Sequence, residues 1–143
     1  MKKFIFELEE ILNVRAFEQQ QAEVELGKAL AEEQRIQNQL DNLAMNQIKT
    51  QKEMKGSTNF QDIANASQFY TYVRNQKEKL LSELTQAKII TEEKRNILKS
   101  AIQKTDALKD LKEQQFYEFK EEAKRREQIE MDNIVTGRFK PKA

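Results

Sequence analysis

Residues that interrupt helices are scarce in this sequence, and the scarcity restricts its fold more than any other feature. The 143 residues include three Gly and one Pro, too few to separate many short elements. Between Phe4 and Lys55 the only such residue is Gly27, and apolar residues recur there at helical spacing. We therefore predict a first helix of about 50 residues within residues 1–55.

Gly27 itself lies inside this predicted helix, where Gly costs about 1 kcal/mol relative to Ala. A close approach by another backbone would account for the residue. A Gly that is simply tolerated on a helix surface explains it equally well.

The one cluster of turn residues inside the chain is Gly56-Ser57-Thr58-Asn59, so residues 56–59 are predicted to form a turn. Thr58 and Gln61 have the spacing of a capping box, which favours a new helix from residue 60. This helix is predicted over residues 60–136, ending near Gly137, with a tail over residues 137–143. Because the connection is short, the helices must run antiparallel. The predicted fold is all-α, a long antiparallel two-helix coiled-coil hairpin with unequal arms.

Two heptad seams follow from apolar residues that recur in alternating steps of three and four. The first helix carries its seam at Ala22, Leu26, Ala29, Glu33, Ile36, Leu40, Leu43, Gln47, Thr50 and Met54. The second carries its seam at Val73, Leu80, Leu84, Ala87, Thr91, Lys94, Leu98, Ala101, Thr105 and Leu108, and more weakly at Phe119 and Ile129. Several of these positions are polar, and each fully buried aliphatic that is missing forgoes about 1.5–3 kcal/mol. Either partner proteins complete the pairing, or the polar residues set its register.

The unequal lengths leave part of the second helix unpaired. If pairing starts at the turn, Met1 lies opposite a residue near Gln115, and about 25 residues have no partner in the chain. The unpaired part begins with Phe116, Tyr117 and Phe119, which makes it a candidate docking helix. The alternative is that it frays or packs on Phe4 and Phe6.

A second group of aromatic residues follows the turn. Phe69, Tyr70 and Tyr72 lie within about one helical turn, so at least one ring must be exposed. These rings form either a partner site or the packing of the hairpin tip.

Composition excludes several classes of function. The sequence has no Cys and no His, which removes disulfides, thiolate chemistry and the commonest metal ligand. No phosphate-binding Gly-rich loop can be built, so we expect no cofactor, no metal site and no enzyme activity. Net charge is +1, and the basic run at residues 120–127 has Glu121-Arg125 and Glu122-Arg126 spacing, typical of a solvated helix rather than a nucleic-acid site.

Glu7, Glu9 and Glu10 interrupt the opening residues before an apolar run of signal-peptide length can form. No stretch has the roughly 18–20 apolar residues that a membrane-spanning helix needs. We therefore expect a cytoplasmic protein.

The opening Phe6-Glu7-Leu8-Glu9-Glu10-Ile11-Leu12-Asn13-Val14-Arg15 and the closing Glu127-Gln128-Ile129-Glu130-Met131-Asp132 resemble the terminal patterns of the FliJ family, coiled-coil components of flagellar type III export. The resemblance implies a stalk within the hexameric export ATPase. It also implies contacts with the export gate protein FlhA and with export chaperones. Through these partners alone the protein would lie at the cytoplasmic face of the inner membrane.

When the contact residues of the family are matched to this sequence by position, the resemblance also implies two partner-contact sites. The ATPase-ring contact would comprise Phe6, Leu8, Leu12, Arg15, Glu127, Met131 and Asp132. The export-gate contact would comprise Gln39, Leu43, Asn46, Tyr72, Gln76 and Glu83. Asn46 and Thr50 stand where the family pattern has tyrosines, and Gln76 where it has an aliphatic residue. Other partner-facing aromatics would be Phe69, Tyr70, Phe116, Tyr117 and Phe119. A structural spacer or a cargo-holding chaperone without ATPase contact is the alternative function, since the same heptads serve it.

Overall fold

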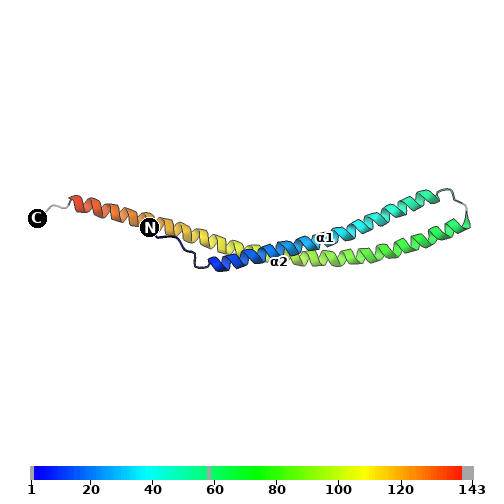
Figure 1. Cartoon of the computed structure of the whole chain (residues 1–143), viewed down its shortest axis with the longest axis horizontal. Coiled ribbons are helices and arrows are strands. Elements are labelled where there is room, and N and C mark those ends of the chain that lie inside the picture. Colours follow the sequence, from blue (N-terminus) through cyan, green and yellow to red (C-terminus); the bar gives the residue numbers. More distant parts are fainter. Residues whose placement is uncertain (1, 58, 140–143) are drawn as a thin grey trace. The chain divides into compact units, whose positions relative to one another are not determined.

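The computed structural model describes residues 2–57 and 59–139, with side chains described as far as residue 137. Two helices make up the fold: α1 (Glu9–Met54) has 46 residues and α2 (Phe60–Phe139) has 80. Figure 1 shows them joined by one short connection. The predicted all-α hairpin with unequal arms is confirmed.

The chain divides into two compact units, each containing part of both helices. Unit 1 comprises Met1–Gln19 and Ser100–Ala143, and unit 2 comprises Gln20–Lys99. Within unit 2, Ile36 clusters with Leu80 and Leu84, whereas Met54 meets Ile63 in the first turns of α2. Because partner numbers on α2 fall as numbers on α1 rise, the helices of this unit are antiparallel.

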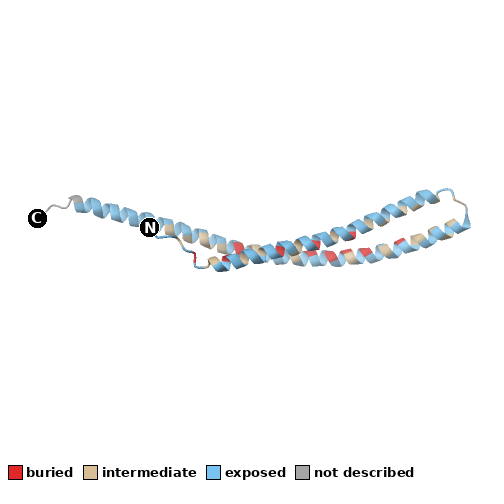
Figure 2. Cartoon of the chain, in the orientation of Figure 1, coloured by how far each residue is buried: buried red, intermediate tan, exposed pale blue. Residues whose placement is uncertain are grey.

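The core of unit 2 is a narrow seam, visible as a line of buried residues in Figure 2. Ile36 is 2% exposed and packs with Leu80, Leu84 and Ala87, flanked by Leu40 and Leu43. Every predicted seam position on α1 is buried or half-buried, as is every one on α2 from Val73 to Leu108. The predicted seams are therefore confirmed over this length. Phe119 is half-buried, but Ile129 is exposed and belongs to no seam.

Two polar seam residues are buried without loss of hydrogen bonding. The hydroxyl of Thr91 donates to the carbonyl oxygen of Ala87 at 2.9 Å, and that of Thr105 donates to Ala101 at 3.0 Å. Thr105 is 1% exposed. Each hydroxyl donates its hydrogen bond to a carbonyl oxygen of the same helix, so each threonine lies in the seam with its polar atom hydrogen-bonded.

The turn is capped by Asn59. Its side-chain oxygen accepts from the backbone N–H of Gln61 at 2.9 Å, and its carbonyl oxygen accepts from Ile63 at 3.0 Å. This is the geometry of an N-cap. The predicted cap at Thr58 lies outside the described residues. Gly56 has a φ of +83°, which suits glycine because the residue has no Cβ.

Three expectations for the helices need correction. First, α1 begins at Glu9 rather than Phe4. Phe4 packs on α2 and Phe6 is buried, whereas Ile5 between them is exposed, an alternation that extended backbone provides and a helix does not. Second, α2 continues through Gly137 to Phe139. Third, among the described residues, no atom outside the local helix backbone lies within 4 Å of a Cβ built on Gly27, so no other backbone segment of this chain approaches it.

Candidate protein-interaction sites

The six residues of the predicted export-gate contact lie around one groove in unit 2. The groove has a volume of about 460 Å³ and is lined by residues of both α1 and α2. Its lining contains Gln39, Leu43, Asn46, Tyr72, Gln76 and Glu83, together with Arg35, Asn42, Lys79 and Leu80. The hairpin thus gathers residues that are distant in sequence. Their role as a gate contact stays a prediction.

The chemistry of this groove is mainly that of side-chain amides. Gln39, Asn42, Asn46 and Gln76 each offer a donor and an acceptor, and the ring of Tyr72 is exposed. Amides of this kind can bind the polar backbone of another protein, and an exposed tyrosine adds apolar area. The groove therefore suits a polypeptide partner.

One cation of the groove is already engaged. Arg35 donates to Glu32 through Nε at 2.9 Å and through Nη2 at 2.6 Å. These hydrogen bonds, aided by the charge of Arg35, lower the pKa of Glu32. The same contacts raise the pKa of Arg35, and the charge of Glu83 adds a smaller effect in that direction. Lys79 has no ion pair among the residues described here, so this cation is available to a partner.

A second candidate site lies in unit 1, where the extended N-terminal segment packs on α2. The ring of Phe4 sits between those of Phe116 and Phe119, with centroid distances of 5.3 and 5.7 Å. Lys120 places its Nζ 4.7 Å from the centroid of Phe116. Tilted aromatic pairs of this kind contribute about 0.5–1.5 kcal/mol each. Of the alternatives predicted for Phe116 and Phe119, the structure therefore shows packing on Phe4.

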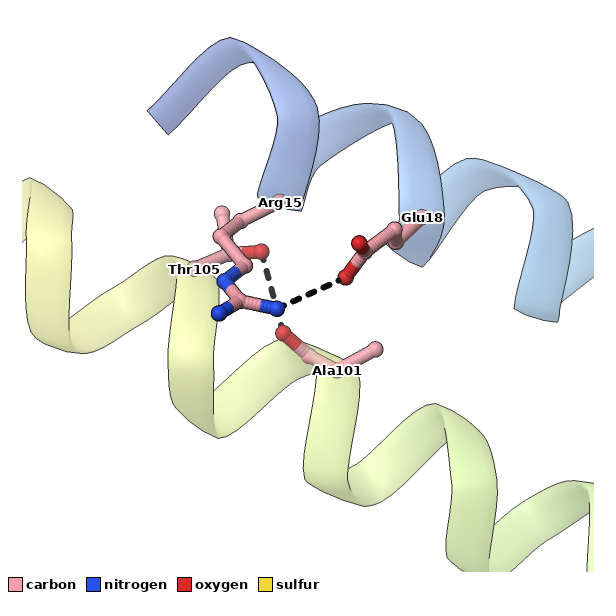
Figure 3. Close-up of polar contacts among 4 residues, drawn as sticks. All are labelled: Arg15, Glu18, Ala101 and Thr105. Carbon is pink, nitrogen blue, oxygen red and sulfur yellow. Dashed lines mark hydrogen bonds and ion pairs between the residues drawn. The ribbon is translucent and has the colours of Figure 1, made fainter. Parts of the chain in front are cut away.

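Most N-terminal residues of the predicted ATPase-ring contact serve internal packing. Phe6 and Leu12 are buried, and Leu8 is half-buried. Figure 3 shows the guanidinium of Arg15 turned toward the part of α2 that carries Ala101 and Thr105. Its Nη1 lies 3.1 Å from Oε2 of Glu18. These side chains support the fold of unit 1 before any partner binds.

The start of α1 is fixed to α2 by charge as well as by apolar packing. Nζ of Lys112 lies 2.8 Å from Oε2 of Glu9. Glu9 and Glu10 occupy the first turn of α1, where carboxylates interact favourably with the helix dipole. The N–H of Glu9 also donates to the carbonyl oxygen of Phe6 at 3.1 Å, which closes the turn between the extended segment and the helix.

The other three residues of the ring contact stand on the exposed end of α2. All described side chains from residue 120 to residue 137 are exposed, among them Glu127, Met131 and Asp132. Met131 follows Phe119 by about 18 Å of helix, at 1.5 Å per residue. The seven predicted residues therefore fall into a packed N-terminal group and an exposed C-terminal group.

Ion pairs along this exposed helix connect neighbouring turns. Glu122 pairs with Arg126 at 3.6 Å, as its spacing predicted, and with Arg125 at 4.0 Å. Glu121 pairs with Lys124 at 3.9 Å rather than with Arg125. Each such pair contributes only about 0.2–0.5 kcal/mol, but together they favour a helix that has no neighbour to pack on.

The remaining predicted aromatics differ in exposure. Phe69 and Tyr70 are half-buried with ring centroids 6.1 Å apart. Tyr72 and Tyr117 are exposed, and Phe116 is exposed on one side. The expectation that at least one ring near the turn is exposed is met by Tyr72.

No group of three His, Cys, Asp or Glu side chains could hold a metal ion among the residues with described positions. Within the same residues, neither helix contains a stretch long and apolar enough to cross a membrane.

Comparison with known proteins gives one match. The family model described as "Flagellar FliJ protein" matches residues 4–143, which is nearly the whole chain. The search of curated proteins and the search of solved structures each returned no match.

Proposed function

Since the match over residues 4–143 shows that the chain belongs to the flagellar FliJ family and has a role in flagellar protein export, we propose that it acts as a stalk for the hexameric export ATPase. In this proposal the chain also links the ATPase to the export gate FlhA and to export chaperones. The observation that carries the stalk proposal is the end of α2, where every described side chain from residue 120 onward is exposed on an unbroken helix.

A single chain in a ring of six equivalent subunits contacts them unequally. A subunit bound through Met131 or Asp132 is biased toward one conformation, whereas its neighbours are not, so the chain shifts the ring between its states. The groups that hydrolyse ATP belong to the ring in this proposal. The chain supplies differential binding free energy and no catalytic residue.

The first experiment mixes the purified chain with the flagellar export ATPase and measures ATP hydrolysis and ring formation. Deletion of residues 121–143 removes the exposed helix after Lys120 but keeps Phe4, Phe116, Phe119 and Lys120, so the aromatic packing of unit 1 is retained. We expect the deletion to abolish both stimulation and co-elution with the ring.

Met131 and Ile129 give a matched pair for the same assay. Both side chains are exposed, but two residues correspond to about 200° of helix, so they lie on opposite faces. We expect Met131→Ala to weaken ring binding about tenfold and Ile129→Ala to have little effect. Equal effects of the two substitutions, or no stimulation by the wild-type chain, would reject the stalk. A chain that keeps its chaperones after the deletion, with no ATPase effect, would instead support the cargo-holding alternative.

The gate contact is tested at Tyr72, which lines the groove of unit 2. Tyr72→Ala removes an exposed ring, and the expected result is a loss of FlhA affinity of at least tenfold in a binding titration. Tyr117→Ala removes an exposed ring of the same type from unit 1 and serves as the control. Retention of full affinity by Tyr72→Ala would show that the groove is not the gate contact.

A further inference from the structure

The charges of this chain are distributed unevenly, although their total is +1. Residues 7–41 contain nine acidic and three basic residues, a net charge of −6. Residues 42–77, which surround the turn, contain two acidic and five basic residues, a net charge of +3. The basic residues of this second segment are Lys49, Lys52, Lys55, Arg74 and Lys77. The turn of unit 2 is therefore a local source of positive potential that the total charge conceals.

Exposed apolar side chains accompany these lysines. We use "tip surface" for Met45, Ile48, Lys49, Lys52, Lys55 and Phe60. On α1, the seam residues Leu43, Gln47 and Thr50 face α2, and helical spacing puts Met45, Ile48 and Lys52 on the opposite side. Met45 is 68% exposed and Ile48 is 53% exposed. Phe60, the first residue of α2, is 82% exposed.

The lysines of the tip surface are not neutralised within the chain. In the described part of the structure, the side chains of Lys49, Lys52 and Lys55 form no ion pair and no hydrogen bond. The nearby carboxylate of Asp62 accepts a hydrogen bond from the hydroxyl of Ser57 at 3.2 Å. Three cationic groups and three apolar groups are thus exposed around the turn of unit 2, where Glu53 and Asp62 are the two carboxylates of residues 42–77.

We propose that the tip surface binds the anionic surface of a lipid bilayer. The lysines interact with lipid phosphates, and Phe60, Met45 and Ile48 enter the boundary between headgroups and acyl chains. The apolar groups are separate side chains on two segments rather than a continuous stripe. Lipids adapt to such an arrangement because they move laterally, and lysine stems are long enough to keep the charge in water. The inference is independent of the proposed ATPase and gate contacts.

Vesicle flotation with the full chain tests the proposal. The probe is a vesicle of phosphatidylcholine with about one-third phosphatidylglycerol, compared with pure phosphatidylcholine. We expect flotation only with the anionic vesicles, and release in concentrated NaCl because salt screens the attraction. Each lysine near an anionic surface contributes about fivefold to partitioning, so Lys49→Gln, Lys52→Gln and Lys55→Gln combined should weaken it about 100-fold.

Matched controls separate the tip surface from charge in general. Lys88→Gln, Lys99→Gln and Lys104→Gln combined remove the same charge from exposed positions of α2 and should reduce partitioning far less. Phe60→Ser should weaken binding about tenfold, whereas Phe17→Ser, at an exposed position of α1, should have little effect. Helical content measured by circular dichroism verifies that each variant folds.

Two results would overturn the proposal. One is no flotation of the wild-type chain with anionic vesicles. The other is an equal loss in the two triple variants, which would make binding a general charge effect. If residues 7–41 of a second copy cover the tip surface instead, the chain sediments as a salt-sensitive dimer and does not float, and the lipid assignment is then wrong. Failure of the ATPase assay with retained flotation would leave this inference standing.

Discussion

The seam of unit 2 can be tested at Ile36, whose side chain is 2% exposed and packs against Leu80, Leu84 and Ala87. Truncation to alanine removes three carbon atoms. At about 0.8 kcal/mol for each buried methylene, the lost transfer free energy is about 2.4 kcal/mol. A residual cavity increases the loss, but a seam between only two helices closes or admits water, which keeps the loss in the lower half of the range of about 2–5 kcal/mol. We expect Ile36→Ala to lower the free energy of unfolding by about 2.5–3 kcal/mol.

The assay is a urea titration followed by the helical ellipticity at 222 nm, repeated at several protein concentrations. Ile97→Ala is the matched control, because Ile97 is the same residue type on α2 and is 54% exposed. Its expected loss is below about 0.5 kcal/mol. Equal losses for the two substitutions would refute the reasoning, since they would show that burial in this seam does not determine stability.

Three further substitutions test local features of the fold. Gly27→Ala should raise the free energy of unfolding by about 0.5–1 kcal/mol, because among the described residues no atom outside the local helix backbone lies within 4 Å of the added Cβ; a lower melting temperature would indicate that Gly27 is needed for another reason. Thr91→Val should raise the free energy of unfolding by up to about 1 kcal/mol, because the buried hydroxyl bonds only to the carbonyl of Ala87. A lower urea midpoint would show that the hydroxyl stabilises the seam. Phe4→Ala should speed amide exchange at Glu9, whose N–H donates to Phe6, and leave unit 2 unchanged; unaltered exchange at Glu9 would contradict the role given to the Phe4 ring.

Several features of the fold could be predicted from the sequence because local physics decides them. A heptad pattern states which side of each helix is apolar, and the seam positions from Ala22 to Met54 are all buried or half-buried. The cluster beginning at Gly56 marks the turn, because only there do residues that favour turns gather. A short connection then leaves only an antiparallel arrangement.

The packing of Phe116 and Phe119 on Phe4 was only one of the alternatives that the sequence left open, and local physics did not choose between them. A helix was predicted from Phe4 onward because no Gly or Pro interrupts the first residues. The position of Phe4 depends on Phe116 and Phe119, more than 100 residues away in the sequence, and the area buried against those rings outweighs the small helix propensity of a first turn. Leu12 lies beside Phe4 and Phe116 and is buried, although it was predicted to contact a partner.

The sequence alone thus determined the number of helices, their order, their direction and the side on which each is apolar, since each of these depends on interactions between residues a few positions apart. The tertiary structure decided the register of the termini and the groove shared by Leu43 and Tyr72. It also decided which lysines near the turn have no partner. These features depend on distances between residues that are far apart in the chain, and such distances are fixed only when the two helices pack.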